Sequence, residues 1–190
     1  MKSGILFVLS GPSGVGKGTV LDELLKDFND VEYSVSATTR PPREGEVDGE
    51  DYHFLTEDEF FNIKEKDGFL ESARVHKHFY GTPKKYVDKS LKKGKDIILE
   101  IDIQGARQVK KKYPNAVFIF LVPPSFSELK DRLKKRNTEN EESKKIRLEN
   151  AKEEIAEIDQ YDYQIVNDKV KNAVKEIKNI IKKEQTKRRG

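Results

Sequence analysis

Short apolar runs alternate along the chain with longer segments in which apolar residues recur every three or four positions. The short runs predict buried strands, and they lie at residues 5–9, 31–35, 69–75, 96–102, 116–122 and 163–166. The segments between them carry the helical period, most regularly from Val170 to Ile181. Strands that alternate with helices in this way predict an α/β protein whose central parallel sheet is covered on both faces.

Polar residues beside these segments predict where single helices begin and end. Thr56 and Glu59 have the spacing of a capping box, in which each side chain accepts a backbone N–H of the other residue. Thr82 precedes Pro83, which predicts a helix with Thr82 as its N-cap and proline in its first position. The tail 182–190 carries few apolar residues, so we expect it to fray.

A glycine-rich stretch joins the first predicted strand to the first predicted helix. Its residues are Gly11, Pro12, Ser13, Gly14, Val15, Gly16, Lys17, Gly18 and Thr19. Glycines allow a sharp turn in which successive backbone N–H groups and a helix N-terminus point at one anion, and Lys17 adds a positive charge. An ordinary strand-to-helix turn is the alternative, but the spacing and the strand-then-helix context favour a phosphate-binding loop.

The residue after Lys17 departs from the commonest form of this loop. Gly18 stands where a serine or threonine hydroxyl would normally bind Mg²⁺. Two alternatives remain: Thr19 supplies the ligand instead, or phosphate oxygens and water hold the ion.

Composition narrows the class of protein. The 190 residues fit one domain, and 37 basic residues are interleaved with 34 acidic ones for a net charge of +3. Because the two signs are mixed along the chain, we expect no nucleic-acid partner. A substrate with several phosphates explains the local arginine clusters equally well. There are no cysteines, and the longest apolar run, 116–122, is too short to cross a bilayer. We therefore expect a cytoplasmic protein with no membrane partner.

Two arginines stand beside a rigid turn. Arg40 and Arg43 flank Pro41 and Pro42, where helix is excluded, and paired guanidiniums can clamp a phosphate with bidentate hydrogen bonds. An exposed basic loop is the alternative.

Acidic residues accompany two of the predicted strands. Glu71 lies between apolar neighbours in the strand 69–75, where it is either a solvated edge residue or a ligand-binding acid. Glu100 and Asp102 end the strand 96–102 and would share one face, because strand side chains repeat every second residue. At the carboxyl end of a parallel strand, such acids can orient Mg²⁺-bound water or hydrogen-bond a base.

A polar segment between two predicted helices carries arginines at both ends. Arg132 and Arg136 lie one helical turn apart, and Arg147 follows the polar residues 137–143. A lid that brings cations over phosphates would have this composition, and so would a solvated helix connection.

Taken together, the sequence closely resembles the guanylate kinase family of nucleoside monophosphate kinases, from about Ile5 to Ile181. The segments that carry the resemblance are Ser10–Lys17, Ser34–Arg43, Gly49–Tyr52, Tyr80–Thr82 and Glu100–Gly105. The resemblance implies transfer of the γ-phosphate of ATP to GMP, and to dGMP, giving ADP and GDP in purine nucleotide metabolism and GMP recycling. It also implies Mg²⁺ bound with ATP, and a monomer or small homo-oligomer whose partners are the small molecules ATP and GMP.

The resemblance assigns roles to individual residues. Those implied to bind GMP are Ser36, Arg40, Arg43, Tyr52, Glu71, Tyr80, Thr82, Glu100 and Asp102, with the arginines and tyrosines on the phosphate and Ser36, Glu71, Thr82 and Asp102 on guanine. Those implied to be catalytic are Lys17, Arg40, Arg132, Arg136 and Arg147. The glycine-rich loop 11–19 would bind ATP, with Asn167 near the adenine and Thr19 at the metal.

The resemblance further implies a three-layer P-loop kinase fold in one guanylate-kinase-like domain, residues 1–190. Its core would comprise about 1–34, 83–131 and 160–190, its GMP-binding subdomain about 35–82, and its mobile lid about 132–150. Two other functions compete with this one. Guanylate-kinase-like domains of scaffold proteins bind protein partners without catalysis, and other P-loop kinases phosphorylate other acceptors.

Overall fold

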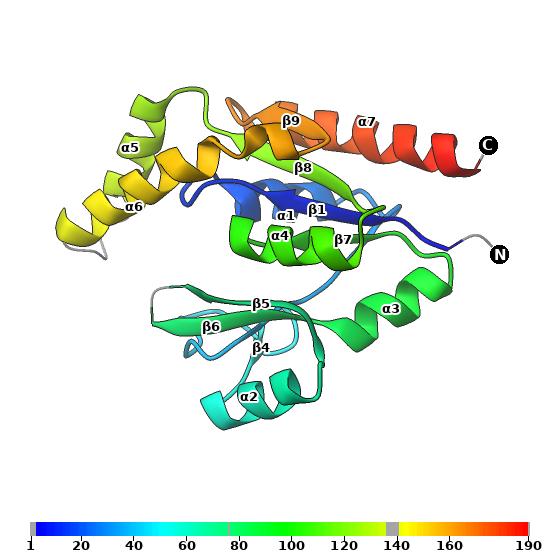
Figure 1. Cartoon of the computed structure of the whole chain (residues 1–190). Coiled ribbons are helices and arrows are strands. Elements are labelled where there is room, and N and C mark those ends of the chain that lie inside the picture. The colour runs from blue at the N-terminus through cyan, green and yellow to red at the C-terminus, as the bar shows by residue number, and fades with distance from the viewer. Residues whose placement is uncertain (1–2, 76, 136–140, 190) are drawn as a thin grey trace. The chain divides into compact units, whose positions relative to one another are not determined.

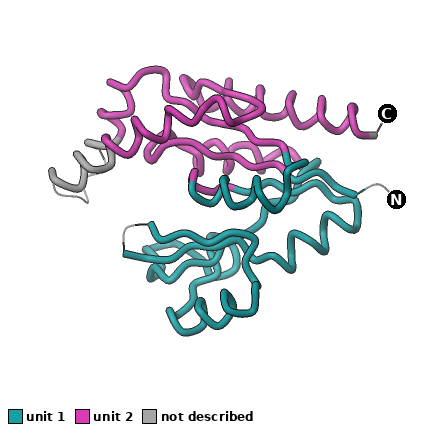
Figure 2. The backbone as a smooth tube through the Cα atoms, in the orientation of Figure 1, with its two compact units in different colours: residues 1–6, 30–99, 104–116 teal, residues 7–29, 100–103, 117–190 magenta. Residues whose placement is uncertain are grey.

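The computed structural model describes residues 3–75, 77–135 and 141–189, and of residues 133–135, 141–147 and 189 it describes only the backbone (Figure 1). Five strands form a central parallel sheet in the order β2-β7-β1-β8-β9, and four form a second sheet in the order β4-β3-β6-β5. The chain divides into two compact units (Figure 2). Unit 1 comprises residues 1–6, 30–99 and 104–116, and unit 2 comprises residues 7–29, 100–103 and 117–190.

Unit 1 is built mainly around the second sheet. Its elements are β2 (Glu32–Tyr33), β3 (Ala37–Thr38), β4 (His53–Phe54), α2 (Glu57–Glu65), β5 (Phe69–Val75), β6 (His78–Pro83) and α3 (Lys84–Lys92), with most of β7 (Ile97–Glu100) and α4 (Ile103–Lys112). The predicted capping box is confirmed, since Thr56 and Glu59 bond each other's backbone N–H groups at the start of α2.

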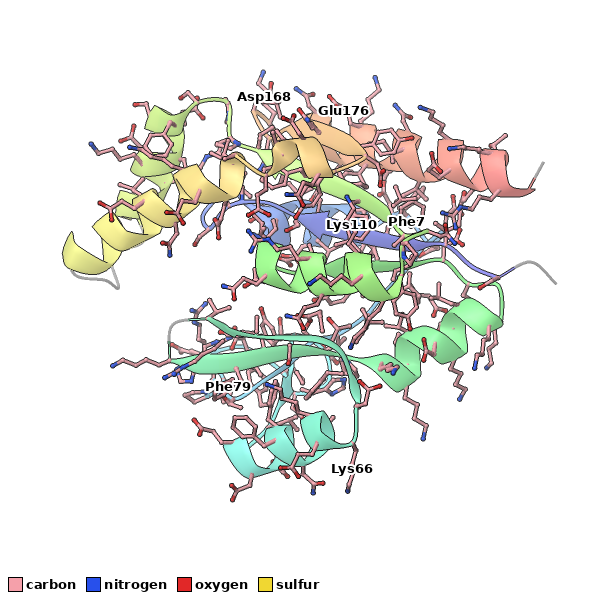
Figure 3. The ribbon with its side chains drawn as sticks, in the orientation of Figure 1. Phe7, Lys66, Phe79, Lys110, Asp168 and Glu176 are labelled. Carbon is pink, nitrogen blue, oxygen red and sulfur yellow. The ribbon has the colours of Figure 1, made fainter. Side chains whose placement is uncertain are left out.

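Aromatic side chains join α2 to the second sheet. The ring of Phe60, which is fully buried, stacks on that of Phe69 with centroids 4.5 Å apart. Phe79 on β6, labelled in Figure 3, packs on the Phe60 ring from the neighbouring strand, with centroids 5.7 Å apart. These contacts fix the β5–β6 hairpin against the helix.

The structure corrects the predicted start of the third helix. Thr82 belongs to strand β6, and α3 begins only at Lys84 with Pro83 in the N-cap position and no side-chain cap bond. The reason is that the Thr82 hydroxyl is buried and donates to the Glu71 carboxylate, 2.7 Å away across the β5–β6 pair. A residue committed to a neighbouring strand cannot cap the helix that follows.

Unit 2 holds the rest of the parallel sheet and its helices. Its elements are β1 (Leu6–Ser10, from Phe7 onward), α1 (Lys17–Leu25), β8 (Val117–Val122), α5 (Phe126–Lys135), α6 (Glu141–Ile155), the short 3₁₀ helix η1 (Ile158–Gln160), β9 (Tyr163–Val166) and α7 (Val170–Arg189). β8 pairs in parallel with β1 on one side and β9 on the other, and all five residues of β1 are buried. The continuous apolar run of β1 is that of a strand covered on both faces.

The expected fraying of the tail is wrong, because α7 continues to Arg189. Ile181 is fully buried and Glu184 is 6% exposed, so the packed face of the helix extends beyond its apolar stripe. The Glu184 carboxylate accepts a 2.7 Å hydrogen bond from the Tyr163 hydroxyl on β9. Burial and this bond raise the pKa of Tyr163 to about 12, so the hydroxyl keeps its proton at neutral pH.

We predict that Tyr163→Phe lowers the free energy of unfolding by about 1–3 kcal/mol, because it leaves a buried carboxylate without its donor. Tyr86→Phe is the matched control, since Tyr86 is 44% exposed and its hydroxyl donates to Glu32, which keeps Ser90 and Lys95 as donors, so the loss should cost less than about 0.5 kcal/mol. Urea unfolding of both variants, followed by far-UV circular dichroism, measures the difference. Equal destabilisation by the two changes would contradict the proposed anchoring of α7.

Candidate functional site

The glycine-rich loop makes an abrupt turn between β1 and α1. Gly11 has a φ of +148°, and a Cβ at this position would lie 2.4 Å from the carbonyl oxygen of Leu121 on β8. Gly16, the N-cap of α1, has a φ of +96°, in the left-handed region that other residues avoid. Only glycine fits these positions, so the loop can pass close to β8 and then start a helix at once.

Three predicted side chains converge on this loop: Lys17 and Asn167 from the ATP site, and Arg132 from the catalytic residues. The Lys17 ammonium donates to the carbonyl oxygens of Gly11, at 2.7 Å, and Pro12, at 3.4 Å. The side-chain amide of Asn167, after β9, donates to the Val15 carbonyl at 2.8 Å. Arg132 on α5 donates to the same carbonyl at 3.2 Å and to the Asn167 carbonyl at 3.0 Å. The loop therefore has a cation on each side and an amide that fixes its backbone.

A carboxylate that the sequence analysis did not identify also contacts the loop. Glu154 on α6 accepts a hydrogen bond from the backbone N–H of Ser13, with 3.3 Å between nitrogen and oxygen. Burial raises the pKa of Glu154, and the nearby charge of Lys17 opposes this shift. The available signal was positional, because Glu154 follows the buried Ala151 by three residues and so lies on the inner side of an amphipathic helix.

Thr19, the predicted metal ligand, lies in the first turn of α1, and Glu100, predicted to orient Mg²⁺-bound water or bind the base, ends β7. A Cβ on Gly18 would meet the Glu100 carboxylate oxygens at 3.7 and 3.9 Å, and the adjacent Thr19 is exposed. Strand β7 ends at Glu100, so the alternation that was expected to align Asp102 with it does not extend that far. Among the described residues, no group of three or more acidic or histidine side chains could hold a metal ion by itself. One or two oxygen ligands beside a phosphate loop still fit Mg²⁺, which takes most of its ligands from phosphate and water.

A second group of predicted residues lies in unit 1 around the β5–β6 hairpin. Glu71 is 4% exposed, so the solvated-edge alternative is excluded. Thr82 faces it in the strand register and donates to its Oε1 at 2.7 Å. Ser36, which precedes β3, is buried as well. Glu71 and Thr82 therefore form a buried polar pair between β5 and β6, and the buried Ser36 lies just before the neighbouring strand β3.

Arg40 lies in a cage of one carboxylate and two aromatic rings. Its guanidinium forms a bidentate pair with Glu46, with nitrogen–oxygen distances of 2.8 and 2.9 Å. The carbon atom of the guanidinium lies 5.4 Å from the centre of the Tyr52 ring, which meets the Tyr80 ring edge-on at 6.0 Å. Glu46 and Tyr80 together raise the pKa of Arg40, so the guanidinium stays charged.

Glu46 also fixes the loop that carries the second arginine. Its carboxylate accepts the backbone N–H of Arg43 at 2.7 Å, while the Arg43 side chain is exposed. The sequence analysis missed Glu46. The signal that could have found it was an acid six residues after Arg40, beyond a Pro-Pro turn that brings the chain back.

Two predicted catalytic residues are described only in part or not at all. Arg136 lies outside the described residues, and the structure gives only the backbone of Arg147, within α6.

The predicted site residues divide between the two units. Unit 2 contains the loop 11–19, Glu100, Asp102, Arg132 and Asn167. Ser36, Arg40, Arg43, Tyr52, Glu71, Tyr80 and Thr82 belong to unit 1 (Figure 2).

Comparison with known proteins gives the family. The family model described as guanylate kinase matches residues 3–184. The chain belongs to the guanylate kinase family. It is 54% identical to a guanylate kinase of Clostridium tetani over 97% of this chain and 88% of that protein. It is 52% identical to one of Caldanaerobacter subterraneus over 95% of this chain and 87% of that protein.

Solved structures agree with this membership of the guanylate kinase family. A crystal structure of guanylate kinase from Anaplasma phagocytophilum matches with a TM-score of 0.81 at 36% identity, over 97% of this chain and 87% of that one. A shikimate kinase from Bacteroides thetaiotaomicron matches with a TM-score of 0.51 at 14% identity, over 94% of this chain and 98% of that one, and shares the fold alone. The predicted P-loop kinase fold with a central parallel sheet is confirmed.

The Arg40–Glu46 pair generates a pH prediction for this guanylate kinase family member. Hydrogen bonds from Arg40 lower the pKa of Glu46, so the pair stabilises the folded chain above the ordinary glutamate pKa. That stability is lost as the pH falls below about 4.3 and through the lowered value. We expect Glu46→Gln to be less stable than wild type at pH 7, and the gap to shrink towards pH 3.

Urea unfolding at pH 7, 5, 4 and 3 measures this gap. Glu44→Gln, at an exposed carboxylate in the same loop, is the control and should follow the wild-type curve. A gap that stays constant across the pH series would show that the Glu46 charge does not stabilise the fold.

Proposed function

We infer that the chain transfers the γ-phosphate of ATP to GMP, giving ADP and GDP, as an ATP:GMP phosphotransferase. The observation that carries this inference is the cation-flanked loop at the end of β1, in a chain that belongs to the guanylate kinase family across residues 3–184. Such a loop with its basic residues suits phosphoryl transfer, which needs positioning and charge neutralisation more than covalent chemistry.

In this proposal the loop 11–19 binds the ATP phosphates. Its backbone N–H groups and the N-terminus of α1 point at the anion, and Lys17 exchanges its two carbonyl acceptors for phosphate oxygens. Arg132 is already fixed against the Val15 carbonyl, so it stands beside the loop without reorganisation. Asn167 holds the loop through that same carbonyl, which supports its proposed place near the adenine of ATP.

The unit 1 cluster binds GMP. A carboxylate can accept both the N1–H and the exocyclic amine of guanine, and Glu71 is buried beside the Thr82 hydroxyl. Adenine has no hydrogen at N1, so its binding would leave a buried acceptor unpaired. The prediction also places Ser36, Thr82 and Asp102 on guanine and counts Glu100 among the GMP-binding residues. Arg40, Arg43, Tyr52 and Tyr80 hold the phosphate, with Arg40 released from Glu46.

The attacking group is an ionised phosphate oxygen of GMP, so no general base is needed. The oxygen attacks the γ-phosphorus in line as the bond to the β-phosphate oxygen breaks. Mg²⁺ bound with ATP would neutralise charge on the phosphates, with Thr19 as its predicted protein ligand. Arg136 and Arg147, in a lid of about 132–150, would add cations at the transferred group.

We also propose that the chain uses dGMP, acts in purine metabolism and GMP recycling, is cytoplasmic, and forms a monomer or small homo-oligomer. We further propose that it divides into a core, a GMP-binding subdomain of about 35–82 and a lid. No helix in the described part of the chain is both long and apolar enough to span a membrane.

A coupled assay of ADP release tests the function directly. We expect turnover with GMP and dGMP and little with AMP or UMP, because only guanine donates from N1 to Glu71. Equal rates with all four acceptors would remove the guanine assignment. A complete lack of turnover would favour the protein-binding module instead.

We predict that Lys17→Ala lowers kcat by about 100-fold or more with the fold intact, because it removes a charge aimed at the transferred phosphate. Lys171→Ala, at an exposed lysine on α7, is the control and should keep full activity. Steady-state kinetics with circular dichroism separate loss of activity from loss of fold. An unchanged kcat in Lys17→Ala would refute the assignment of the loop.

We predict that Arg40→Met raises the KM for GMP by about tenfold or more and changes the KM for ATP much less, because it removes a bidentate phosphate clamp. Arg74→Met, at an exposed arginine on β5, is the control. The two KM values are measured by varying each substrate at saturating levels of the other. A rise in the KM for ATP without a rise in the KM for GMP would contradict the assignment of Arg40 to the GMP phosphate.

A further inference from the structure

The predicted phosphate-binding loop contacts an acidic side chain of the chain itself. The Ser13 backbone N–H donates to Oε2 of Glu154 at 3.3 Å, across 141 positions of sequence. This N–H belongs to the turn whose amides the proposed function assigns to ATP phosphates. Glu154 and Ser13 both lie in unit 2 (Figure 2).

The charges around Glu154 are those of a phosphate site. Lys17 is close enough to favour its ionised form, while Asp102 is close enough to disfavour it. The carboxylate is only partly exposed, and burial opposes its charge. The Ser13 amide, through its hydrogen bond, and Lys17, through its charge, therefore offset the cost of burying this carboxylate, and a bound phosphate would use the same two groups.

The position of Glu154 on its helix explains how it reaches the loop. Ala151 on α6 is fully buried against Leu129 of α5, with Ile155 packed beside this pair. Glu154 follows Ala151 by three residues, so it shares the inward side of α6. A carboxylate on the packed side of a helix is uncommon unless it meets a donor.

We propose that Glu154 is an internal substitute for phosphate, which occupies the loop in the absence of nucleotide and is exchanged for a phosphate oxygen when ATP binds. The proposal rests on the proposed function, because it assumes that the loop 11–19 binds ATP. The exchange makes ATP affinity lower than the loop alone would give, because only the fraction of molecules with Glu154 displaced can bind.

The exchange also links ATP binding to helix α6. Arg147 lies two turns before Glu154 on the same helix, which runs from Glu141 to Ile155 (Figure 1). The Glu154–Ser13 hydrogen bond joins the carboxyl end of α6 to the loop. When a phosphate takes the amide, α6 loses this bond and keeps its packing against α5, so occupancy of the loop changes the contacts of the helix that carries Arg147.

Calorimetric titration of ATP into the full chain tests the proposal. We expect Glu154→Gln, which keeps the shape and removes the charge, to bind ATP about threefold to tenfold more tightly than wild type. Glu154→Asp retains a carboxylate and should stay closer to wild type. Glu153→Gln is the matched control, because Glu153 is the exposed neighbour on the same helix and should leave the affinity unchanged.

The nucleotide-free chain gives a second measurement. Without its internal anion, Glu154→Gln should have a lower melting temperature than wild type when empty, yet gain more from saturating ATP. If Glu154 only stabilised the fold, Glu154→Gln would lower the melting temperature and would bind ATP as tightly as wild type or more weakly. Either result for ATP binding would overturn the proposal. If wild type neither binds ATP nor phosphorylates GMP, the proposed function itself fails. If wild type does both and Glu154→Gln binds ATP no more tightly than wild type, the proposed function stands and only the proposal that Glu154 takes the place of phosphate fails.

Discussion

The conformation of the turn between β1 and α1 is the constraint on which the proposed ATP site depends. Gly11 passes so close to the Leu121 carbonyl that no side chain fits, and Gly16 then adopts a left-handed conformation that lets α1 begin at the next residue. Between these two positions the chain turns back on itself, and the Ser13 amide within the turn donates to the Glu154 carboxylate. The surrounding residues serve the same turn, since Asn167 and Arg132 both bond the Val15 carbonyl from outside it.

Anion sites are electrostatically costly to leave empty, and this chain fills both of its candidate phosphate sites with carboxylates. Glu46 forms a bidentate pair with Arg40 in unit 1, and Glu154 accepts an amide of the loop in unit 2. Each carboxylate holds a cationic or amide-rich site in a defined geometry without nucleotide. In the proposed function these contacts are given up when phosphates bind, so part of the intrinsic phosphate affinity is exchanged for preorganisation.

The sequence predicted the features that depend on local chemistry. The strand-loop-helix of residues 5–19, the parallel strands and the capping box of Thr56 with Glu59 follow from periodicity and from side chains a few positions apart. It failed where a distant partner decides the outcome. Thr82 has the local pattern of a helix cap, but its hydroxyl bonds Glu71, which lies 11 positions away on another strand. The α7 tail has the local composition of a frayed end, but Glu184 bonds Tyr163, which lies 21 positions away. Glu154, 141 positions from Ser13, was beyond any local pattern.

Glu71 shows why burial matters more than the presence of an acid. On a solvated strand edge, a carboxylate would exchange hydrogen bonds with water for hydrogen bonds with a base, so the binding free energy would change little. It would therefore discriminate weakly between purines. At 4% exposure beside Thr82, water cannot replace a missing donor. The inferred choice of guanine over adenine then rests less on the strength of the correct contacts than on the desolvation of an acceptor that the wrong base leaves unpaired. The strand pairing that buries Glu71 is therefore part of the specificity, because any change that lets water reach this carboxylate would weaken the discrimination without touching the base.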